Sequence, residues 1–189
     1  MNPLDTLNDR RSTPARLLGE PGPDPKTLRK LLAAAIRVPD HGKLAPWRLL
    51  LIRGPSRLIL GTRLAEIHAR KEPDIPKALL LKDLERFSFA PVVVAVIARV
   101  ESDHPKVPEQ EQILSAGCVA YNLLLGAQAL GFGAQWLTGW AAYDAQVADL
   151  LGLDENERIV SFVHIGTPRA SAPERVRPSL TDIVSEWNG

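Results

Sequence analysis

The middle of the chain carries an uninterrupted apolar run, Pro91-Val92-Val93-Val94-Ala95-Val96-Ile97-Ala98. A strand with one face in water alternates apolar and polar residues, whereas a strand covered on both faces is apolar throughout. The run is also rich in β-branched residues, which favour strands. It therefore predicts a central strand with a layer of protein on each side.

Further strands and helices are predicted on both sides of this run. Periodicity and turn residues predict three more strands, at residues 47–52, 134–137 and 159–165. The predicted helices cover residues 3–12, 25–37, 76–87, 109–130 and 144–151. One more helix is predicted with Ser56 as its N-cap, and it includes Ile67. Strands alternate with helices at irregular spacing, so the predicted fold class is α+β with three layers rather than a regular βαβ array.

The helix predicted at residues 109–130 has apolar residues almost all the way round. A helix without a polar face is buried either in a core or in a subunit interface. The segment from about residue 166 carries Pro168, Pro173 and Pro178, and we expect it to form an extended arm that need not pack on its own domain. Together these features predict an intertwined homodimer.

The composition limits the possible partners and the compartment. With 189 residues and 20.7 kDa, the chain has the length of one domain, residues 1–189. Lys and Arg number 23 against 22 Asp and Glu, and this net charge of +1 argues against a nucleic-acid or membrane surface. No apolar run reaches the roughly 20 residues of a membrane span. The single cysteine excludes an intramolecular disulfide and fits a reducing compartment, so we expect a cytoplasmic protein.

Several common sites lack support in the sequence. The four histidines do not have the spacing of metal ligands. We expect His68 on a solvated helix face and His164 in the core or at a strand edge with satisfied hydrogen bonds. Gly131-Phe132-Gly133 lacks the third glycine of a dinucleotide fingerprint and is interpreted as a helix end. Cys118 falls in mid-helix among apolar residues, where a thiol is usually an inert small hydrophobe.

Cationic residues gather at a few places in a chain of almost zero net charge. Arg10-Arg11-Ser12 lies where the first predicted helix ends, and two guanidiniums with one hydroxyl can hold a phosphate. A basic pair taken alone is more often a solvated surface. Other cations are Arg37, the pair His41 and Lys43 in the Pro39–Pro46 loop, and Arg169, Arg175 and Arg177 of the arm. As a group they indicate a local site for a small anion.

Five stretches of the chain share their order with the motifs of a known family. They are Asn8-Asp9-Arg10-Arg11-Ser12, residues 35–43 leading to Pro46-Trp47, Glu111 through Ser115-Ala116-Gly117-Cys118, residues 131–139, and Ile165-Gly166-Thr167-Pro168. In this order they resemble the nitroreductase family of flavin enzymes, in particular its compact single-domain members. The resemblance covers nearly the whole chain. It implies a three-layer α/β/α fold in which helices flank a central, mostly antiparallel sheet.

The resemblance also implies an obligate homodimer with two FMN sites, each lined by residues of both chains. The residues that it assigns to the ribityl phosphate are Arg10, Arg11 and Ser12. Arg37 and His41 would reach the same flavin from the partner subunit. In the arm, Arg177 is assigned a further phosphate contact, whereas the spacing after Ser12 puts a role for Arg16 in doubt.

A third group of residues is assigned to the flavin ring. These residues are Trp136, Leu137, Thr138 and Gly139. A backbone amide among them can form a hydrogen bond with flavin N5. Reduction adds negative charge near flavin N1 and O2, so a cation there, either Lys43 or a protonated His41, would raise the flavin potential.

These implications define the expected activity. It is that of an FMN-dependent NAD(P)H oxidoreductase, in which hydride passes from NADPH or NADH to flavin N5 and then to a nitroaromatic, quinone-like or related electron-poor small molecule. The substrates bind in turn, and no side chain is expected to act as a nucleophile. The proton comes from water or from His41. The alternatives are a flavin enzyme of the same fold with a non-nitro substrate, a flavin-binding or sensing protein without turnover, and a structural dimer without flavin.

Overall fold

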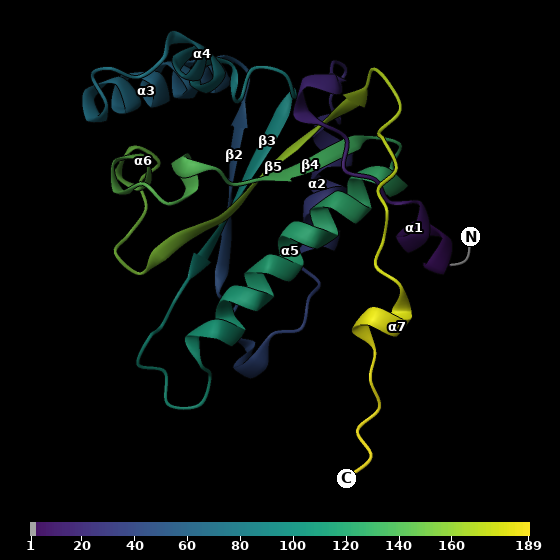
Figure 1. Cartoon of the computed structure of the whole chain (residues 1–189). Coiled ribbons are helices and arrows are strands. Elements are labelled where there is room, and N and C mark those ends of the chain that lie inside the picture. Colours follow the sequence, from purple (N-terminus) through teal and green to yellow (C-terminus); the bar gives the residue numbers. More distant parts are fainter. Residues whose placement is uncertain (1–2) are drawn as a thin grey trace.

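The computed structural model describes residues 3–189, and a five-stranded sheet lies at its centre (Figure 1). Its strands are β1 Leu18–Gly19, β2 Trp47–Arg53, β3 Val92–Arg99, β4 Gly133–Leu137 and β5 Glu157–Pro168. Strand β5 pairs with β1, β3 and β4, while β2 pairs with β3, and each of these pairings is antiparallel. Of the predicted domain 1–189, Met1 and Asn2 lie outside the described residues.

Helices cover both faces of the sheet. They are α1 Pro3–Asp9, α2 Pro25–Ala35, α3 Pro55–Lys71, α4 Lys77–Glu85, α5 Glu109–Ala129, α6 Ala145–Leu150 and α7 Leu180–Ile183. Short 3₁₀ turns are η1 Ala15–Leu17, η2 His41–Lys43 and η3 Trp140–Ala142. Residues of α2 and α5 form one core with the sheet, and residues of α3 and α6 form a second core on its other face. The predicted α+β fold with three layers and an antiparallel sheet is confirmed.

Strand β3 lies between β2 and β5 and is buried on both faces. Val94 and Val96 point into the core formed with α2 and α5, whereas Val93 and Ala95 point into the core formed with α3. Successive strand side chains alternate between the two faces of a sheet. The uninterrupted apolar run at residues 91–98 therefore results from a helix layer on each side.

The long helix α5 is only half covered by its own chain. One side packs in the core through residues such as Val119 and Leu123, which are fully buried. The opposite side carries an exposed apolar stripe at helical spacing. Its members are Leu114, which is 60% exposed, Cys118, Tyr121, which is 39% exposed, and the half-buried Leu125. Residues spaced by three or four positions share a helix face, so these four form one continuous surface.

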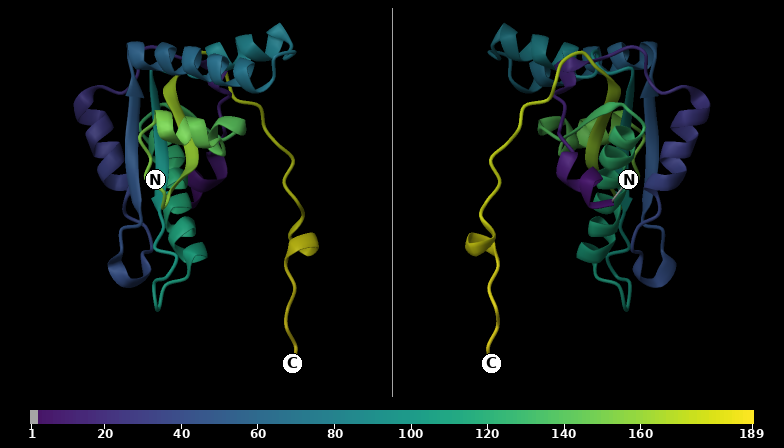
Figure 2. Two further views of the ribbon diagram at one scale, coloured as in Figure 1. Left: turned by 90° about the vertical axis from the view of Figure 1, so that its left-hand side faces the viewer. Right: turned by 90° about the vertical axis from the view of Figure 1, so that its right-hand side faces the viewer.

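The C-terminal arm, residues 169–189, is attached to the folded body at its start, where the Arg169 N–H donates to the Leu17 carbonyl at 2.8 Å and Glu174 pairs with Arg11. Its later part, with α7, extends away from the body in both views of Figure 2. Apart from the short helix α7, it is extended and exposed. It nevertheless carries large apolar side chains, namely Val176, Leu180, Ile183, Val184 and Trp187. The predicted start of the arm at about residue 166 is slightly early, because β5 continues to Pro168.

The first predicted helix, residues 3–12, ends earlier in the structure, at Asp9. The backbone N–H of Arg11 donates to Gln128 Oε1 at 2.9 Å, and that of Thr13 donates to the Ala134 carbonyl at 3.0 Å. These two bonds hold the segment beside α5 and β4, so its N–H groups are not available to continue the helix. Local periodicity contains no information about such distant partners.

Two further boundaries differ from prediction. Strand β1 has two residues, too few for a periodic pattern, and its pairing with Thr167 and Pro168 extends β5 beyond the predicted residue 165. The predicted cap at Ser56 is wrong, because α3 begins at Pro55 and Gly54 is the residue before it. Proline suits the first helical position, where its missing N–H costs no hydrogen bond. The other predicted elements agree with the structure to within about two residues at each end.

Three side-chain predictions require correction. His68 is not solvated, because its Nδ1 lies 2.6 Å from Oδ2 of the buried Asp83. His164 is in the core as predicted, but neither of its ring nitrogens has a hydrogen-bond partner among the described residues. Cys118 lies in mid-helix beside apolar residues as predicted, but its side chain is exposed on the stripe of α5 and not packed in the core.

Glu157, at the start of β5, connects three strands. Its buried carboxylate accepts hydrogen bonds from Arg48 Nε and Nη2 of β2, both at 2.6 Å, and from Arg99 Nε of β3 at 3.0 Å. The bonds from Arg48 contribute most, and together with Arg99 they outweigh burial and lower the pKa of Glu157 to about 2. The carboxylate therefore stays charged at neutral pH and fixes β2, β3 and β5 together at one end of the sheet.

We predict that His164 limits stability in acid. Burial, with a smaller contribution from the Arg86 charge, lowers the pKa of His164 to about 4. Since the unfolded chain takes up this proton near pH 6.5, the folded state loses stability as the pH falls from 6.5 towards 4. Between pH 7 and pH 4.5, the free energy of unfolding should fall by about 2 to 3 kcal/mol more in the wild type than in His164→Leu.

Urea unfolding of both proteins at the two pH values measures this effect. The other titratable groups contribute equally to the wild type and the variant. The difference between the two proteins in their loss of unfolding free energy therefore reports on His164 alone. Parallel loss of stability in the two proteins would contradict the prediction.

Candidate functional site

The predicted phosphate-binding residues lie together where α1 ends. The Arg11 amide is bonded to Gln128 near the C-terminal end of α5, and Arg10 Nη1 donates to Ser12 Oγ at 3.3 Å. The segment then runs past the start of β4, since the buried Thr13 is bonded to Ala134. Tertiary hydrogen bonds thus hold three donor side chains on a short fixed segment.

The arm brings a carboxylate and a further guanidinium to the same place. Glu174 forms an ion pair with Arg11, and its other oxygen lies 3.5 Å from Arg177 Nη2. Arg177 Nη1 also donates to the Arg175 carbonyl at 3.0 Å. The structure therefore unites Arg177 with the Arg10–Ser12 segment, and the two guanidiniums share one anionic group. Arg10 makes no ion pair within residues 3–189.

The loop that follows α2 is bound to α5 at three points. Asn122 Nδ2 donates to the carbonyls of Ala35 at 3.1 Å and Arg37 at 3.2 Å. Ser115 Oγ donates to the Pro39 carbonyl at 2.8 Å, and His41 Nδ1 lies 2.7 Å from Glu111 Oε2.

The three α5 residues Glu111, Ser115 and Asn122 are spaced by four and seven positions, so they lie on one helix face. This face fixes the positions of Arg37 and His41.

The same loop has an unusual backbone. Lys43 and Ala45 have φ values of 57° and 47°, in the left-handed region that non-glycine residues avoid, and the Gly42 between His41 and Lys43 has φ 74°. The Asp40 carboxylate stabilises the turn by accepting hydrogen bonds from the backbone N–H groups of Leu44 and Ala45. Strained residues of this kind concentrate at functional sites. The exposed side chains of His41 and Lys43 project from this fixed turn.

The two cationic groups of one chain lie far apart. His41 is bound near the beginning of α5 by Glu111, while Arg11 is bound near its end by Gln128. An α-helix rises 1.5 Å per residue, so the 17 residues from 111 to 128 span about 25 Å. A single chain therefore does not bring His41 and Lys43 to the Arg10–Ser12 segment.

Strand β4 carries the residues predicted to contact a flavin ring. Trp136 packs against the core on the α5 side, and Leu137 lines a pocket on the other side of the strand together with Gly139. Because adjacent strand residues face opposite ways, a planar ring would meet both only along the strand edge. Such an edge exists, since β4 pairs with β5 alone. Thr138 and Gly139, whose φ is 65°, follow directly.

The pocket beside Leu137 contains cations that sequence reasoning missed. It measures about 480 Å³ and is lined by Ala15, Arg16, Ala78, Leu81, Lys82, Glu85, Arg86, Phe89, Leu137 and Gly139. Lys82 and Arg86 belong to the α4 region, which has no motif that would single them out. Arg16 is the arginine whose role the motif spacing leaves in doubt, and the structure places it at this pocket.

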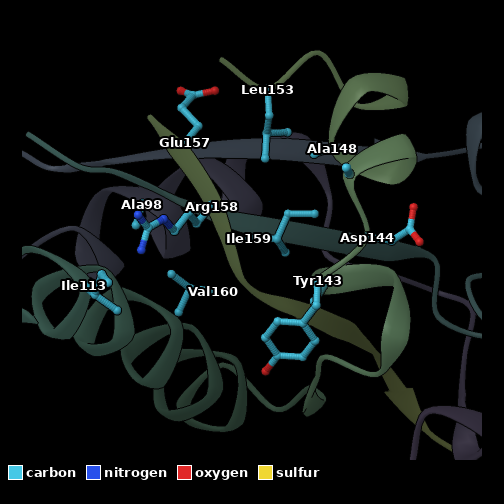
Figure 3. A pocket seen from close by; sticks show the side chains of 12 residues that line it. Ala98, Ile113, Tyr143, Asp144, Ala148, Leu153, Glu157, Arg158, Ile159 and Val160 are labelled. Carbon is cyan, nitrogen blue, oxygen red and sulfur yellow. The ribbon is translucent and has the colours of Figure 1, made fainter. Parts of the chain in front are cut away.

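A second pocket, of about 490 Å³, is mostly apolar and contains none of the predicted site residues. Figure 3 shows Ile113 of α5 on one side of β5 and Ala148 of α6 on the other, with Tyr143 nearby. The Tyr143 side chain is 79% exposed. The pocket is lined by Arg158, but not by Arg10, Arg11, Arg37, His41, Lys43 or Arg177.

Within residues 3–189, no three His, Cys, Asp or Glu side chains are placed to hold a metal ion. None of the described helices is both long and apolar enough to span a membrane.

Comparison with known proteins identifies the family. Residues 7–167 match the nitroreductase family. A Haemophilus influenzae protein, provisionally named an NAD(P)H nitroreductase, is 35% identical over 177 residues, which are 94% of this chain and 94% of its own. Escherichia coli YdjA, with the same provisional name, is 34% identical over 186 residues, 98% of this chain and 99% of its own.

Solved structures share the fold over almost the full length. A nitroreductase-like family protein from Bacillus cereus has a TM-score of 0.78 and 25% identity, covering 98% of this chain and 96% of its own. A Desulfovibrio desulfuricans protein, provisionally named a nitroreductase and crystallised with FMN, has a TM-score of 0.76 and 23% identity, covering 100% and 99%. With most of its length matched by the family and relatives above 30% identity spanning nearly all of it, this chain belongs to the nitroreductase family.

Proposed function

We propose that this protein is an FMN-dependent NAD(P)H oxidoreductase that reduces nitroaromatic, quinone-like or related electron-poor small molecules. The names of the relatives from Haemophilus influenzae and Escherichia coli support NAD(P)H as the donor, and the fold neighbour crystallised with FMN supports the cofactor. The observation that carries the proposal is the meeting of Arg11 and Arg177 on the Glu174 carboxylate, beside Arg10 and Ser12. An anion already occupies the place assigned to the FMN phosphate.

The donor set fits a phosphate. Three guanidiniums and one hydroxyl can neutralise a group of about −1.5 to −2 charge and satisfy its oxygens. In this assignment Arg10, Arg11 and Ser12 bind the phosphate and Arg177 completes the set. Because one carboxylate carries a single charge, a phosphate would displace Glu174 from Arg11.

The edge of β4 fits the ring. Trp136, Leu137 and Thr138 would present backbone along the ring, and Gly139 directly follows them. When bound, FMN supplies two-electron hydride transfer through N5. For a nitro compound, one turnover consumes NAD(P)H and a proton and yields NAD(P)⁺, the nitroso compound and water. The proton comes from water or from His41.

The site requires a second subunit in this proposal. His41 is bound to Glu111 near the beginning of α5, with Lys43 in the same turn, whereas Arg11 is bound to Gln128 about 25 Å further along the helix. Arg37 is bound to Asn122, about 9 Å along the helix from Gln128. A two-fold axis through the exposed stripe of α5 would cross two copies of the helix, bringing the beginning of one near the end of the other. The stripe supplies the apolar contact, and the exposed apolar residues of the arm supply a second contact with the partner.

Experiment can distinguish two alternative functions from the proposed one. One is a flavin enzyme of the same fold with a non-nitro substrate, and the other is a flavin-binding or sensing protein without turnover. The proposal also retains a single domain with a C-terminal arm and a cytoplasmic location as predictions.

Spectroscopy of the purified protein tests the proposed function. We expect a yellow protein, or one that becomes yellow with added FMN, and bleaching by NADPH or NADH without air. A yellow protein that neither donor bleaches would support the binding protein. A colourless protein that takes up no FMN would refute the proposal.

Arg10→Ala should weaken FMN binding about 10- to 100-fold, because a charged hydrogen bond to the phosphate contributes about 1.5 to 3 kcal/mol. Flavin fluorescence titration measures the affinity, and the loss should shrink in high phosphate. Arg29→Ala, which changes an exposed arginine of α2, is the matched control and should have no effect. Equal affinities for Arg10→Ala and wild type would show that the phosphate binds elsewhere.

Mixed dimers test whether the site is shared. Arg10→Ala/Ser12→Ala and Arg37→Ala/His41→Ala homodimers should each bind FMN weakly. In a heterodimer of the two, one site carries both defects and the other carries neither, so a statistical mixture should regain normal affinity at about a quarter of its sites. If each site lies within one chain, mixing will restore none.

A further inference from the structure

The pocket beside Leu137 gathers positive charge from three separate elements. Arg16 belongs to η1, Lys82 to α4, and Arg86 follows α4 directly. Within the described residues, Arg16 and Lys82 make no ion pair, and the only carboxylate in the lining is the exposed Glu85. Like charges brought together without enough counter-charge repel one another, so the pocket favours a bound anion.

Arg86 is held in place from behind. Asp83 is 1% exposed, and its Oδ1 accepts hydrogen bonds from Arg86 Nη2 and Trp140 Nε1, both at 2.9 Å. Its Oδ2 lies 2.6 Å from His68 Nδ1. Although burial alone would raise the pKa of Asp83, these three hydrogen bonds lower it below its ordinary value. Asp83 is therefore a fixed charged anchor that determines the direction of the guanidinium.

The front of the Arg86 guanidinium lies against the predicted ring segment. A Cβ atom on Gly139 would stand only 2.6 Å from Arg86 Nη1, so the side chain occupies space that any residue other than glycine would fill. A guanidinium has five N–H donors. Asp83 uses donors of Nη2, whereas Nη1 has no acceptor among the described residues. Arg86 thus presents fixed, unused donors to the pocket.

The remaining walls of the pocket are apolar. Ala78 and Leu81 come from α4, Phe89 from the loop after it, and Leu137 from β4. An apolar cavity with a few fixed polar groups is the usual form of a small-molecule site. This one has room for an aromatic ring between Leu81, Phe89 and Leu137, with cations to receive a charged substituent.

We propose that this pocket is the part of the acceptor site that binds a carboxylate, so that the preferred acceptors are electron-poor aromatic acids. The proposal rests on the proposed function, because it places the acceptor beside the residues assigned to the flavin ring. Arg86, held by Asp83, is the principal donor to the carboxylate, and Lys82 and Arg16 add attraction from the exposed side. The neutral analogue of such an acid would leave these cations unpaired.

The test compares 4-nitrobenzoate with 4-nitrobenzamide, which have nearly the same shape but differ in charge. Wild-type enzyme should show a kcat/KM about 10-fold or more higher for the acid, mainly through KM. Lys82→Gln and Arg16→Gln should each lower that ratio several-fold. Lys77→Gln removes the same charge from an exposed position of α4 outside the pocket and should leave the ratio unchanged. Arg86→Lys keeps the positive charge but loses the two-pronged guanidinium donor. It should therefore lower the ratio of kcat/KM for the acid to that for the amide, unlike Lys77→Gln.

A binding measurement separates this proposal from the proposed function. Calorimetry with benzoate, which cannot be reduced, should detect binding to wild type and weaker binding to Lys82→Gln, even if the protein has no turnover. Equal kcat/KM for the acid and the amide, together with no benzoate binding, would overturn the proposal. A rise of the KM for NADPH but not for NADH in Lys82→Gln, with the acid preference intact, would also overturn it, because the cations would then bind the donor's phosphate.

Discussion

The attachment of two distant segments to one rigid helix is the constraint on which the site depends. Helix α5 packs on the sheet with one side, and its polar residues Glu111, Ser115 and Asn122 bind the loop after α2. Near its other end, Gln128 binds the segment that contains Arg11. The helix therefore fixes both the position and the separation of the two cationic groups, and the exposed stripe between them is the surface through which the proposed dimer would complete the site.

The layers of the fold could be predicted because they follow from burial. A strand that is apolar on both faces needs a layer of protein on each side. The apolar run at residues 91–98 therefore predicts the two layers that the structure has. What could not be predicted depends on contacts between distant parts of the chain. Strand β1 forms where Leu18 and Gly19 pair with the end of β5, and just after the end of α1 the amides of Arg11 and Thr13 donate to Gln128 and Ala134.

The candidate site was predictable where cations lie in recognisable motifs. The Arg10–Ser12 segment and the Pro39–Pro46 loop are both ordered by tertiary hydrogen bonds, and Arg177 does meet Arg11 through Glu174. Lys82 and Arg86 were not predicted, because a surface helix such as α4 carries cations whatever its role. Their role becomes visible only in the folded structure, where both line the pocket beside Leu137 and Arg86 lies against Gly139. His68 was misjudged for the same reason, since its partner Asp83 comes from another helix.

The length of α5 has a consequence for how this chain can vary. One residue inserted between Asn122 and Gln128 would turn the far end of the helix by about 100° and advance it about 1.5 Å, which would carry Gln128 away from the Arg11 amide. The architecture tolerates an insertion there only if it adds close to a whole helical turn, about 3.6 residues. Each added turn would lengthen the distance between Asn122 and Gln128, where the two segments are attached. Within its own chain the arm is under no such rule beyond Arg177, because its exposed residues make few contacts there. In the arm, only the contacts with a partner subunit would limit length variation, whereas in the helix the fold of a single chain already excludes it.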